Sequence, residues 1–219
     1  MSIQKRKERE RKLHRERIID GAIELIEEQG FEKTTMDEIA ARAEISKGSL
    51  YLYFKDKATL YIAIKKRGLN KIISIFMSLI QKDEKGAVIL KKMILSFLEY
   101  TTTHLSFTKA MIKADGANQK CLMEDSPAQE CEKLTDEIFM LIVRVIQIGK
   151  QDGSIQIDMP SKLLGLMISL HMNGILQFVL REQDHKGQKI LIEHDITLPQ
   201  LIERFLDIQF SNTQTLNEN

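Results

Sequence analysis

The stretch that most constrains the fold is residues 34–57, which reads TTMDEIAARAEISKGSLYLYFKDK. Thr35, or Thr34 beside it, can cap the start of a helix whose first turn carries two carboxylates. Small apolar residues follow at helical spacing, and after a short break Ser46 can cap a second helix that ends near Phe54. Two short helices joined by a tight turn form a helix-turn-helix, in which the second helix can enter the major groove of DNA.

The order and spacing of residue types here resemble the signature of the TetR/AcrR family of transcriptional regulators. The matching positions are Gly30, Phe31, Thr34, Thr35, Met36, Ile39, Ala40, Ala43, Ile45, Ser46, Gly48, Leu50, Tyr51, Tyr53, Phe54 and Lys57. Glu44 stands where the family usually has glycine in the turn, and Ala58 stands where it often has glutamate. The resemblance implies an all-α chain. An N-terminal three-helix DNA-binding domain would be joined, by a shared long helix, to a helical ligand-binding and dimerisation domain.

The residues expected to contact DNA are Thr35, Lys47, Gly48, Ser49, Tyr51, Tyr53 and Lys57. Lys47 can reach a base acceptor or a phosphate, and Gly48 allows the helix to approach DNA closely. Thr35 can present its hydroxyl and a free backbone N–H to a phosphate, and Lys57 can hold another. Residues at these positions of the resembling family commonly contact DNA. For Tyr51, packing inside the small domain is the alternative.

The charge of the chain is divided unevenly between its two parts. Residues 1–68 hold 16 Lys and Arg against 12 Asp and Glu, a net charge of +4, and residues 69–219 hold 16 against 19, a net charge of −3. A basic first third suits a polyanionic partner. We predict a basic N-terminal arm at 1–17, a helix-turn-helix domain at 18–68, a ligand-binding and dimerisation domain at 69–210 and a disordered tail at 211–219. The arm is either a solvated, partly disordered tail, or an extended start of the first helix, or a contact with phosphates or the minor groove.

The apolar periodicity predicts helices along the whole chain, and three prolines with few alternating runs argue against strands. Helices are expected at about 13–29, 57–80, 86–104, 106–114, 126–150, 163–181 and 197–210, with polar loops at 115–125 and 185–194. Gly30 is expected to end the first of these helices. The domain boundary is predicted near Gly68, inside one long helix, so movement at one end of that helix can be felt at the other.

Adaptable or polar residues within the apolar helices of the second domain are candidates for a small-molecule pocket, because such pockets are largely apolar with few polar groups. They are Phe97, Tyr100, Thr101, His104, Phe107, Met111, Met140, His171 and Gln177. For each of them, ordinary core packing is the alternative.

The helix at 163–181, together with the last helix, is the candidate dimer interface because it is apolar nearly all round. Gly165, Ser169 and Gly174 would permit the close approach of a partner helix. The resemblance implies an intersubunit four-helix bundle. A two-fold dimer would then present two recognition helices to a palindromic operator.

Other functions find little support in the sequence. The chain has no glycine-rich phosphate loop and no GxSxG motif, so neither an enzyme nor a cofactor is expected. His185, Glu193, His194 and Asp195 lack helical metal-ligand spacing and are interpreted as a solvated stretch. Cys121 and Cys131 are interpreted as reduced thiols, with a redox switch as the alternative.

A membrane location is not expected either. Polar residues interrupt the apolar stretch at 163–180, and the charged start of the chain has no apolar leader. We therefore expect a cytoplasmic homodimer that binds double-stranded operator DNA, most simply as a repressor released by a small hydrophobic or amphipathic effector. Activation is left open, and the alternative is a helical adaptor of the same fold that acts mainly through a protein partner.

Overall fold

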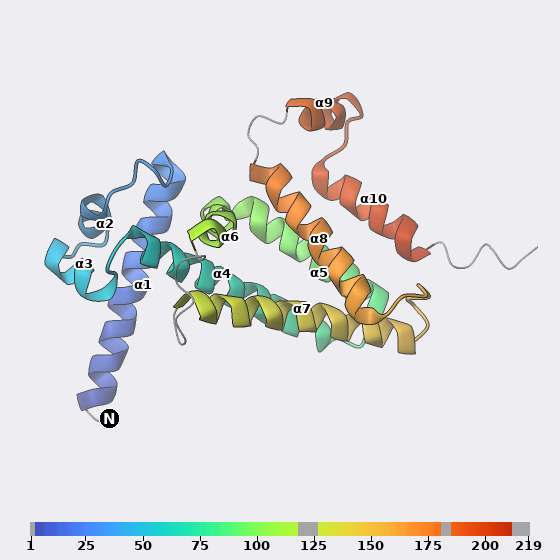
Figure 1. The fold of residues 1–219 in the computed structure, drawn as a ribbon, viewed down its shortest axis with the longest axis horizontal. Coiled ribbons are helices and arrows are strands. Elements are labelled where there is room, and N and C mark those ends of the chain that lie inside the picture. Colours follow the sequence, from blue (N-terminus) through green and yellow to red (C-terminus); the bar gives the residue numbers. More distant parts are fainter. Residues whose placement is uncertain (1–2, 118–126, 181–184, 212–219) are drawn as a thin grey trace, which may run out of the picture. The chain divides into compact units, whose positions relative to one another are not determined.

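Helices make up almost all of the described chain in the computed structural model, which describes residues 3–117, 127–180 and 185–211 (Figure 1). Those ranges contain no β-strand, which confirms the all-α prediction. The helices are α1 (Ile3–Gln29), α2 (Met36–Arg42), α3 (Lys47–Tyr53), α4 (Lys57–Ile80), α5 (Gly86–Thr103), α6 (Leu105–Ala117), α7 (Pro127–Gln151), α8 (Ser161–Leu180), α9 (His185–Glu193) and α10 (Leu198–Ser211). Cys121, most of the predicted loop at 115–125 and most of the predicted tail lie outside the described residues.

The chain forms two compact units. Unit 1 comprises residues 1–68 and 105–131, and unit 2 comprises residues 69–104 and 132–219. Both α4 and α7 begin in unit 1 and continue into unit 2. The α6 helix, which the predicted limits assign to the ligand-binding domain, belongs to unit 1. As functional domains, the predicted limits stay a prediction.

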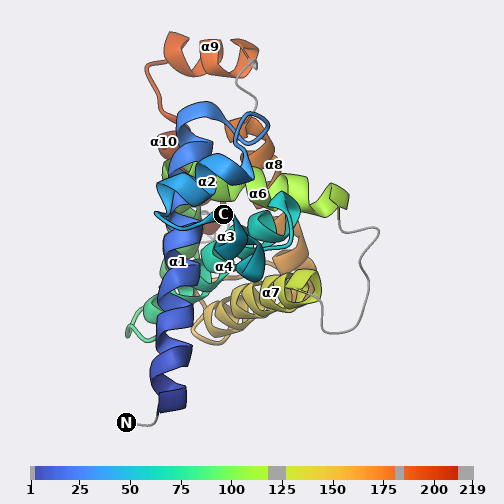
Figure 2. The same cartoon turned by 90° about the vertical axis from the view of Figure 1, so that its left-hand side faces the viewer.

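Unit 1 is built on the apolar stripe of α1. Ile18, Ala22 and Ile26 are buried there, together with Ile39 of α2 and Leu50 of α3. The helix starts at Ile3, about ten residues before the predicted start. Most of the basic arm is therefore helical, which agrees with the alternative that it extends the first helix (Figure 2). The helix ends before Gly30, which has a φ of +83°, a conformation that glycine adopts without steric cost. The predicted stop is therefore confirmed.

Within unit 1, α6 packs against α1 and α4. The Phe107 ring lies so close to Gly68 of α4 that a Cβ there would sit 2.0 Å from its Cδ2 atom. The Ser106 hydroxyl donates a hydrogen bond to the Glu27 carboxylate of α1 (3.1 Å). These contacts give α6 its place in unit 1.

Unit 2 is a helical bundle in which α5 is central and contacts both α8 and α10. The first turn of α5 is capped from the connector after α7, because Asp152 accepts from the Gly86 N–H (2.7 Å) and Ser154 from the Ala87 N–H (3.0 Å). A Cβ at Gly86 would lie 2.1 Å from the backbone nitrogen of Gly149, so glycine is required for this close approach of α5 and α7.

One predicted loop of unit 2 is wrong. Residues 185–193 form α9, and Gly187 packs against the Phe178 ring of α8, where a Cβ would lie 2.5 Å from Cε2. The polar composition of the segment favoured a loop. Its apolar residues Ile190 and Ile192 are exposed and do not form a stripe that faces the core. The helix therefore lacks the buried face by which sequence patterns usually identify a helix.

Candidate DNA-binding surface and ligand cavity

The first helix of the predicted helix-turn-helix, α2, begins with a complete capping box. The Glu38 N–H donates to Thr35 Oγ1 (3.3 Å), and Glu38 Oε2 accepts from the Thr35 N–H (2.8 Å). Glu38 also accepts from the Thr35 hydroxyl (2.8 Å), and these bonds lower the pKa of Glu38. The expectation of a free Thr35 N–H is therefore wrong, and a phosphate there would have to displace Glu38.

A bidentate ion pair locks α2 onto α1. The Arg42 guanidinium lies 2.7 and 2.9 Å from the two oxygens of Glu28 and 3.1 Å from Glu24. The hydrogen bonds from Arg42 lower the pKa of the Glu28 carboxyl. The helices can meet at this point because Gly21 of α1 has no Cβ, and one placed there would lie 3.1 Å from Arg42 Cγ.

The turn between α2 and α3 keeps a left-handed residue although it lacks the usual glycine. Glu44 has φ +56°, a region that costs a residue with a Cβ about 1–2 kcal/mol. The Ile45 N–H donates to the Ala40 carbonyl (3.0 Å) across this turn. Ser46 then caps α3 by accepting from the Ser49 N–H (3.1 Å). The predicted helix-turn-helix is thus formed, with its turn conformation intact.

The recognition helix α3 buries one side and exposes the other. Leu50 and the C-cap residue Phe54 are buried in the core of unit 1. The surface of the helix that stays outside the core, here called the α3 outer face, is made by the exposed or half-buried residues Lys47, Gly48, Ser49, Tyr51 and Leu52. Tyr51 is 45% exposed, so the alternative that it packs inside the domain is wrong. Tyr53 is half-buried and packs against the core.

Gly48 is not required by packing within the chain. A Cβ built there would have Ser46 Oγ as its nearest neighbour, at 3.9 Å. The small residue therefore leaves open space on the outer face, which is what close approach to a DNA backbone needs.

Leu52 is not among the predicted DNA contacts, yet its side chain is 79% exposed beside them. The helical period reveals it, because Leu52 lies two residues from the buried Leu50 and so on the opposite side of α3. An apolar side chain at this place can contact a thymine methyl group.

Lys47 does not stand free on the outer face. Its Nζ atom lies 2.8 Å from Oδ1 of Asp37, in the first turn of α2. The hydrogen bond that Lys47 donates to Asp37 raises the pKa of Lys47, so the side chain stays charged. In the protein without DNA, this cation is held by an internal carboxylate that a phosphate would have to replace.

Lys57 organises the loop in front of α2. Its ammonium group donates to the carbonyl of Thr34 (2.7 Å) and lies 4.3 Å from the centre of the Phe31 ring. Phe31 in turn packs on Tyr61, with ring centres 3.9 Å apart, and burial raises the pKa of Tyr61 to about 12. The predicted phosphate contact of Lys57 stays a prediction, and the observed contacts assign it a positioning role.

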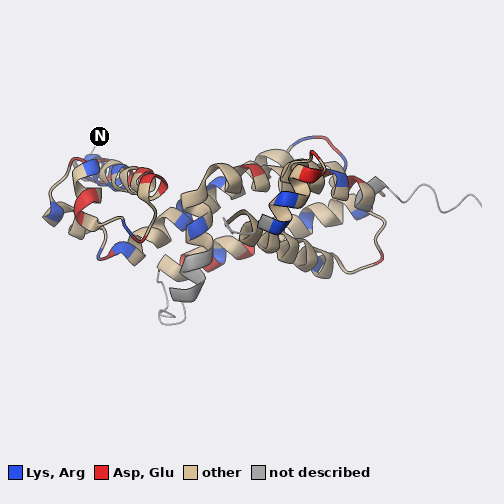
Figure 3. Ribbon diagram, turned by 90° about the horizontal axis from the view of Figure 1, so that it is seen from above, with Lys and Arg blue, Asp and Glu red and all other residues tan. Residues whose placement is uncertain are grey.

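The N-terminal extension of α1 leaves the domain beside the end of α3. The His14 ring lies 6.5 Å from the Tyr53 ring, and the Arg15 guanidinium lies 5.1 Å from the centre of the Phe54 ring. Residues 4–13 before them are exposed and carry most of the arm's Lys and Arg, interspersed with Glu. Basic and acidic residues are also mixed along the ribbon of unit 1 (Figure 3). This position favours the reading of the arm as part of a DNA-binding surface.

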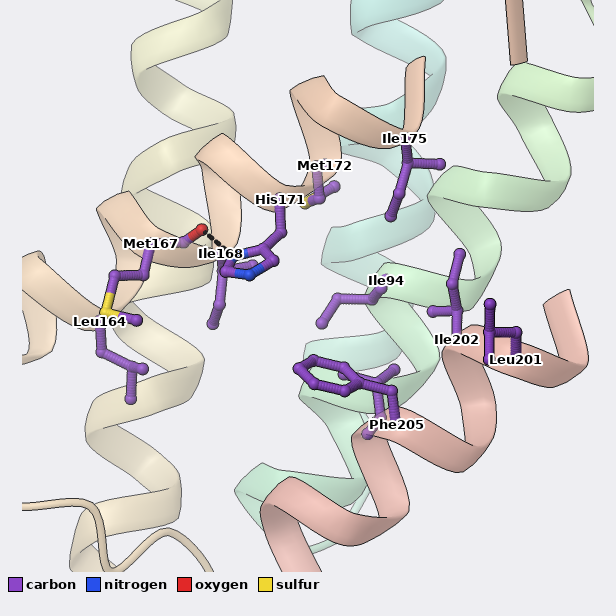
Figure 4. Close-up of a pocket in the computed structure, with 11 residues that line it drawn as sticks. Ile94, Leu164, Met167, Ile168, His171, Met172, Ile175, Leu201, Ile202 and Phe205 are labelled. Carbon is purple, nitrogen blue, oxygen red and sulfur yellow. Dashed lines mark hydrogen bonds between the residues drawn. The ribbon is translucent and has the colours of Figure 1, made fainter. Parts of the chain in front are cut away.

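Unit 2 contains a half-open apolar cavity of about 550 Å³ between α8 and α10, with α5 behind it (Figure 4). Its lining is Ile94 of α5, then Leu164, Met167, Ile168, His171, Met172 and Ile175 of α8, and Leu201, Ile202, Phe205 and Leu206 of α10. The volume lies within the ~300–1,000 Å³ range of small-molecule pockets.

His171 is the one polar residue in that lining. Its Nδ1 atom lies 2.7 Å from the Met167 carbonyl, which can only accept, so Nδ1 carries the proton of this hydrogen bond (Figure 4). Its ring lies 6.3 Å from the ring of Phe205 across the cavity. In the neutral ring, Nε2 is then a hydrogen-bond acceptor.

An ion-pair cluster holds α10 against α5 next to the cavity. Lys91 of α5 lies 2.6 Å from Asp207 and 3.1 Å from Glu203 of α10. The hydrogen bond to Asp207 raises the pKa of Lys91. Two carboxylates face one ammonium group here, so the cluster keeps a net negative charge.

The predicted pocket residues are distributed over both units. His171 lines the cavity. In α5, Phe97 and Thr101 are buried, and the Tyr100 and His104 rings stack 4.2 Å apart. Phe107 and Met111 lie in α6 of unit 1, Met140 is 51% exposed on α7, and Gln177 is exposed on α8.

The predicted dimer residues also differ in their surroundings. Gly165 faces α7 of the same chain, where a Cβ would lie 3.0 Å from Val143, so it serves the packing of one subunit. The Ser169 hydroxyl donates to the Gly165 carbonyl within α8. Gly174 is exposed, with open space around a Cβ.

The exposed side of α8 carries a row of leucines. Leu163, Leu166 and Leu170 are 48–61% exposed, and Gly174 continues the row, which we call the α8 outer face. The helix has the length and hydropathy of a membrane span, yet Leu164, Gly165, Met172 and Leu176 are buried within unit 2. Only 22% of its apolar window is buried by the chain itself.

No group of three His, Cys, Asp or Glu side chains that could hold a metal occurs among the residues that the structure describes. Cys131 is buried, which raises the pKa of its thiol, and its possible partner Cys121 is not described.

Comparison with protein families matches residues 18–64 to the family model of bacterial regulatory proteins, tetR family. This range contains α2 and α3 with the adjoining parts of α1 and α4. The fatty acid metabolism regulator protein of Bacillus subtilis (strain 168) is 38% identical over 56 residues, which is 26% of this chain and 29% of that protein. Alignments with several curated relatives span only about a third of the length of those proteins.

Two further comparisons extend over nearly the whole chain. The HTH-type transcriptional regulator AcrR of Shigella flexneri is 21% identical over 200 residues, 85% of this chain and 91% of that protein. The solved structure of the transcriptional regulator FadR from Bacillus subtilis in complex with stearoyl-CoA has a TM-score of 0.64 at 18% identity, over 89% of this chain and 97% of that one. These likenesses show that the fold of both units is shared.

Proposed function

The chain is a member of the TetR/AcrR family of transcriptional regulators, and from this premise we propose that it is a cytoplasmic, homodimeric repressor released from a palindromic operator by a small hydrophobic or amphipathic ligand. The observation that carries the proposal is the α3 outer face. A lysine, a serine, an exposed tyrosine and an exposed leucine project from a capped helix that a helix-turn-helix holds away from the core. These side chains can bind phosphates, base edges and thymine methyl groups.

The dimer is supported by the α8 outer face. Water-exposed leucines in a row are unfavourable, and a helix that is apolar on more than one side needs more than one packing partner. Leu201, Phe205 and Ile208 of α10 are also exposed at helical spacing. A two-fold contact of α8 and α10 with a second copy would cover both rows. It would set two α3 helices at half-sites about 34–36 Å apart, or a multiple of that distance.

Release by a ligand requires two states of the dimer with different affinities for DNA. The α4 helix is continuous from unit 1 into unit 2, so a change in unit 2 has a rigid element through which to act. A coupling free energy of about 1–3 kcal/mol, typical of allostery, would change operator affinity by roughly 5- to 150-fold.

The test is DNA binding by the full chain at two salt concentrations, with DNA from its own promoter region and an unrelated fragment of equal length. A repressor of this kind binds the promoter fragment with higher affinity. It also loses affinity steeply with salt, because bound lysines and arginines release counterions from phosphates. Equal binding to both fragments would contradict the proposal and favour an adaptor that acts through a protein partner.

A further inference from the structure

The cavity between α8 and α10 has a composition that selects among ligand classes. Of its described lining residues, none is Lys or Arg, and His171 supplies the one polar group. An anionic head group therefore finds no fixed cation in the wall. The charged residues of α10 beside the lining, Glu203, Arg204 and Asp207, are of mixed sign, and Lys91 pairs with the two acidic ones. An anion buried against this wall would therefore lack a charged partner, which disfavours its binding.

The polar group of the wall is also oriented. The Nδ1 atom of His171 is committed to the Met167 carbonyl, so Nε2 of the neutral ring can accept one hydrogen bond from a ligand. The surrounding wall is aliphatic, with the Phe205 ring opposite the imidazole (Figure 4). Burying a donor here without a partner would be costly, and burying an apolar chain is favourable.

We propose that the effector is a neutral, elongated apolar molecule with one hydrogen-bond donor, such as a long-chain alcohol, bound between α8 and α10 with its donor on His171 Nε2. This inference rests on the proposed function for its effect on DNA, but the binding site itself does not depend on it. Because the ligand sits between the two helices that carry the exposed apolar rows, it acts on their spacing and hence on the subunit contact.

The binding test uses the full chain, isothermal titration calorimetry and three probes of equal chain length: decanol, decyl methyl ether and decanoate. Decanol is expected to bind about tenfold more tightly than the ether, which cannot donate, and more tightly than decanoate, which is anionic. In His171→Phe, which keeps a ring beside Phe205, the advantage of decanol over the ether should disappear. An unchanged advantage, or tightest binding by decanoate, would overturn the proposed class.

The location is tested by filling the cavity. Ile202→Phe should weaken decanol binding by tenfold or more. If that variant does not fold, Met167→Phe tests the same point, because Met167 lies at the rim of the cavity and is 43% exposed. Val88→Phe, on the exposed side of α5, is the matched control and should bind as the original chain does. Equal binding in all of these variants would place the ligand elsewhere, and no uptake of decanol by the original chain would overturn the proposed ligand class.

The two proposals can fail separately. If decanol binds with the expected selectivity but the chain shows no preference for its promoter, the proposed function fails and the ligand site stands. If the promoter is bound specifically and decanol neither binds nor lowers operator affinity, the ligand inference fails and the DNA-binding function stands.

Discussion

The α3 outer face and the α8 outer face are both exposed, yet the chain treats them in opposite ways. On α3 the polar groups already have internal partners: Lys47 is held by Asp37, and Ser49 Oγ lies 2.8 Å from Ser46 Oγ. On α8 the leucines have no counterpart beside them and remain in contact with water. The first surface can exist alone and exchange its partners for phosphates, whereas the second is unfavourable until something apolar covers it.

This difference predicts how each surface responds to substitution. Single substitutions on the α3 outer face, whose polar contacts are replaceable, should lower the affinity for DNA in graded steps, and that affinity should depend strongly on salt. On the α8 outer face, which depends on apolar burial, a single charged side chain should prevent the subunit contact.

The largest effect is expected from Leu170→Glu on the α8 outer face. In a two-fold dimer this change brings two carboxylates into one apolar contact, which should weaken dimerisation by on the order of 10³-fold. Analytical ultracentrifugation measures it, with Val88→Glu, also exposed in unit 2, as the control. A stable dimer of Leu170→Glu would remove the α8 outer face from the interface.

The next largest effect is expected from the double variant Lys47→Ala/Tyr51→Ala. Loss of two contacts on the α3 outer face should lower affinity for the promoter by roughly 100-fold or more and leave the dimer intact. Fluorescence anisotropy measures the affinity, and Lys71→Ala, which removes an exposed lysine of unit 2, is the charge-matched control. Normal promoter binding by the double variant would refute the assignment of these residues.

Gly174→Ala examines how closely a partner approaches α8. Alanine favours a helix over glycine, so the isolated chain should not be harmed. An added methyl group in a tight subunit contact should instead weaken dimerisation by about tenfold. Sedimentation of this variant beside Asn173→Ala, its exposed neighbour, separates the two effects, and a tighter dimer would show that no helix packs on Gly174.

Glu44→Gly probes the turn that sets α3 against α2. Glycine adopts φ +56° without strain, but it has more freedom in the unfolded chain, so a net gain of about 0.5–1 kcal/mol in the free energy of unfolding is expected. Chemical denaturation measures the gain. Glu44→Ala keeps the strained conformation and should show none, so equal stability of both variants would mean that the turn is not strained.

The smallest effect is expected from Asp37→Asn, which removes the internal partner of Lys47. Freed for a phosphate, Lys47 should raise promoter affinity by roughly 2- to 5-fold, with a steeper dependence on salt. Weaker binding would mean that Asp37 positions Lys47 for DNA and does not compete with it. Asp136→Asn, in unit 2, serves as the control for the change of one charge.

The sequence predicted the helix-turn-helix well because its determinants are local. The cap at Thr35, the cap at Ser46 and the spacing of Leu50 to Phe54 each involve residues within one or two turns. The same helical period places Leu52 away from the buried Leu50, although an apolar side chain gives no polar signal of a DNA contact. Of the predicted pocket residues, His171 lines the cavity of unit 2, and the assignment of the others to a ligand site stays a prediction. A cavity depends on which faces of three distant helices meet, and residue type does not reveal that.

The sequence by itself determined that the chain is helical and where its short N-terminal helices begin and end, because capping, helical periodicity and turn chemistry act between near neighbours. The same segment carries the residues that resemble the TetR/AcrR signature. Only the tertiary structure decided that Gly165 packs inside the subunit while Gly174 faces outward, that Lys47 is paired with Asp37, and that His171 lines an apolar cavity. Each of these depends on contacts or open space around residues that share the same sequence signal, and burial and distance in three dimensions set them apart.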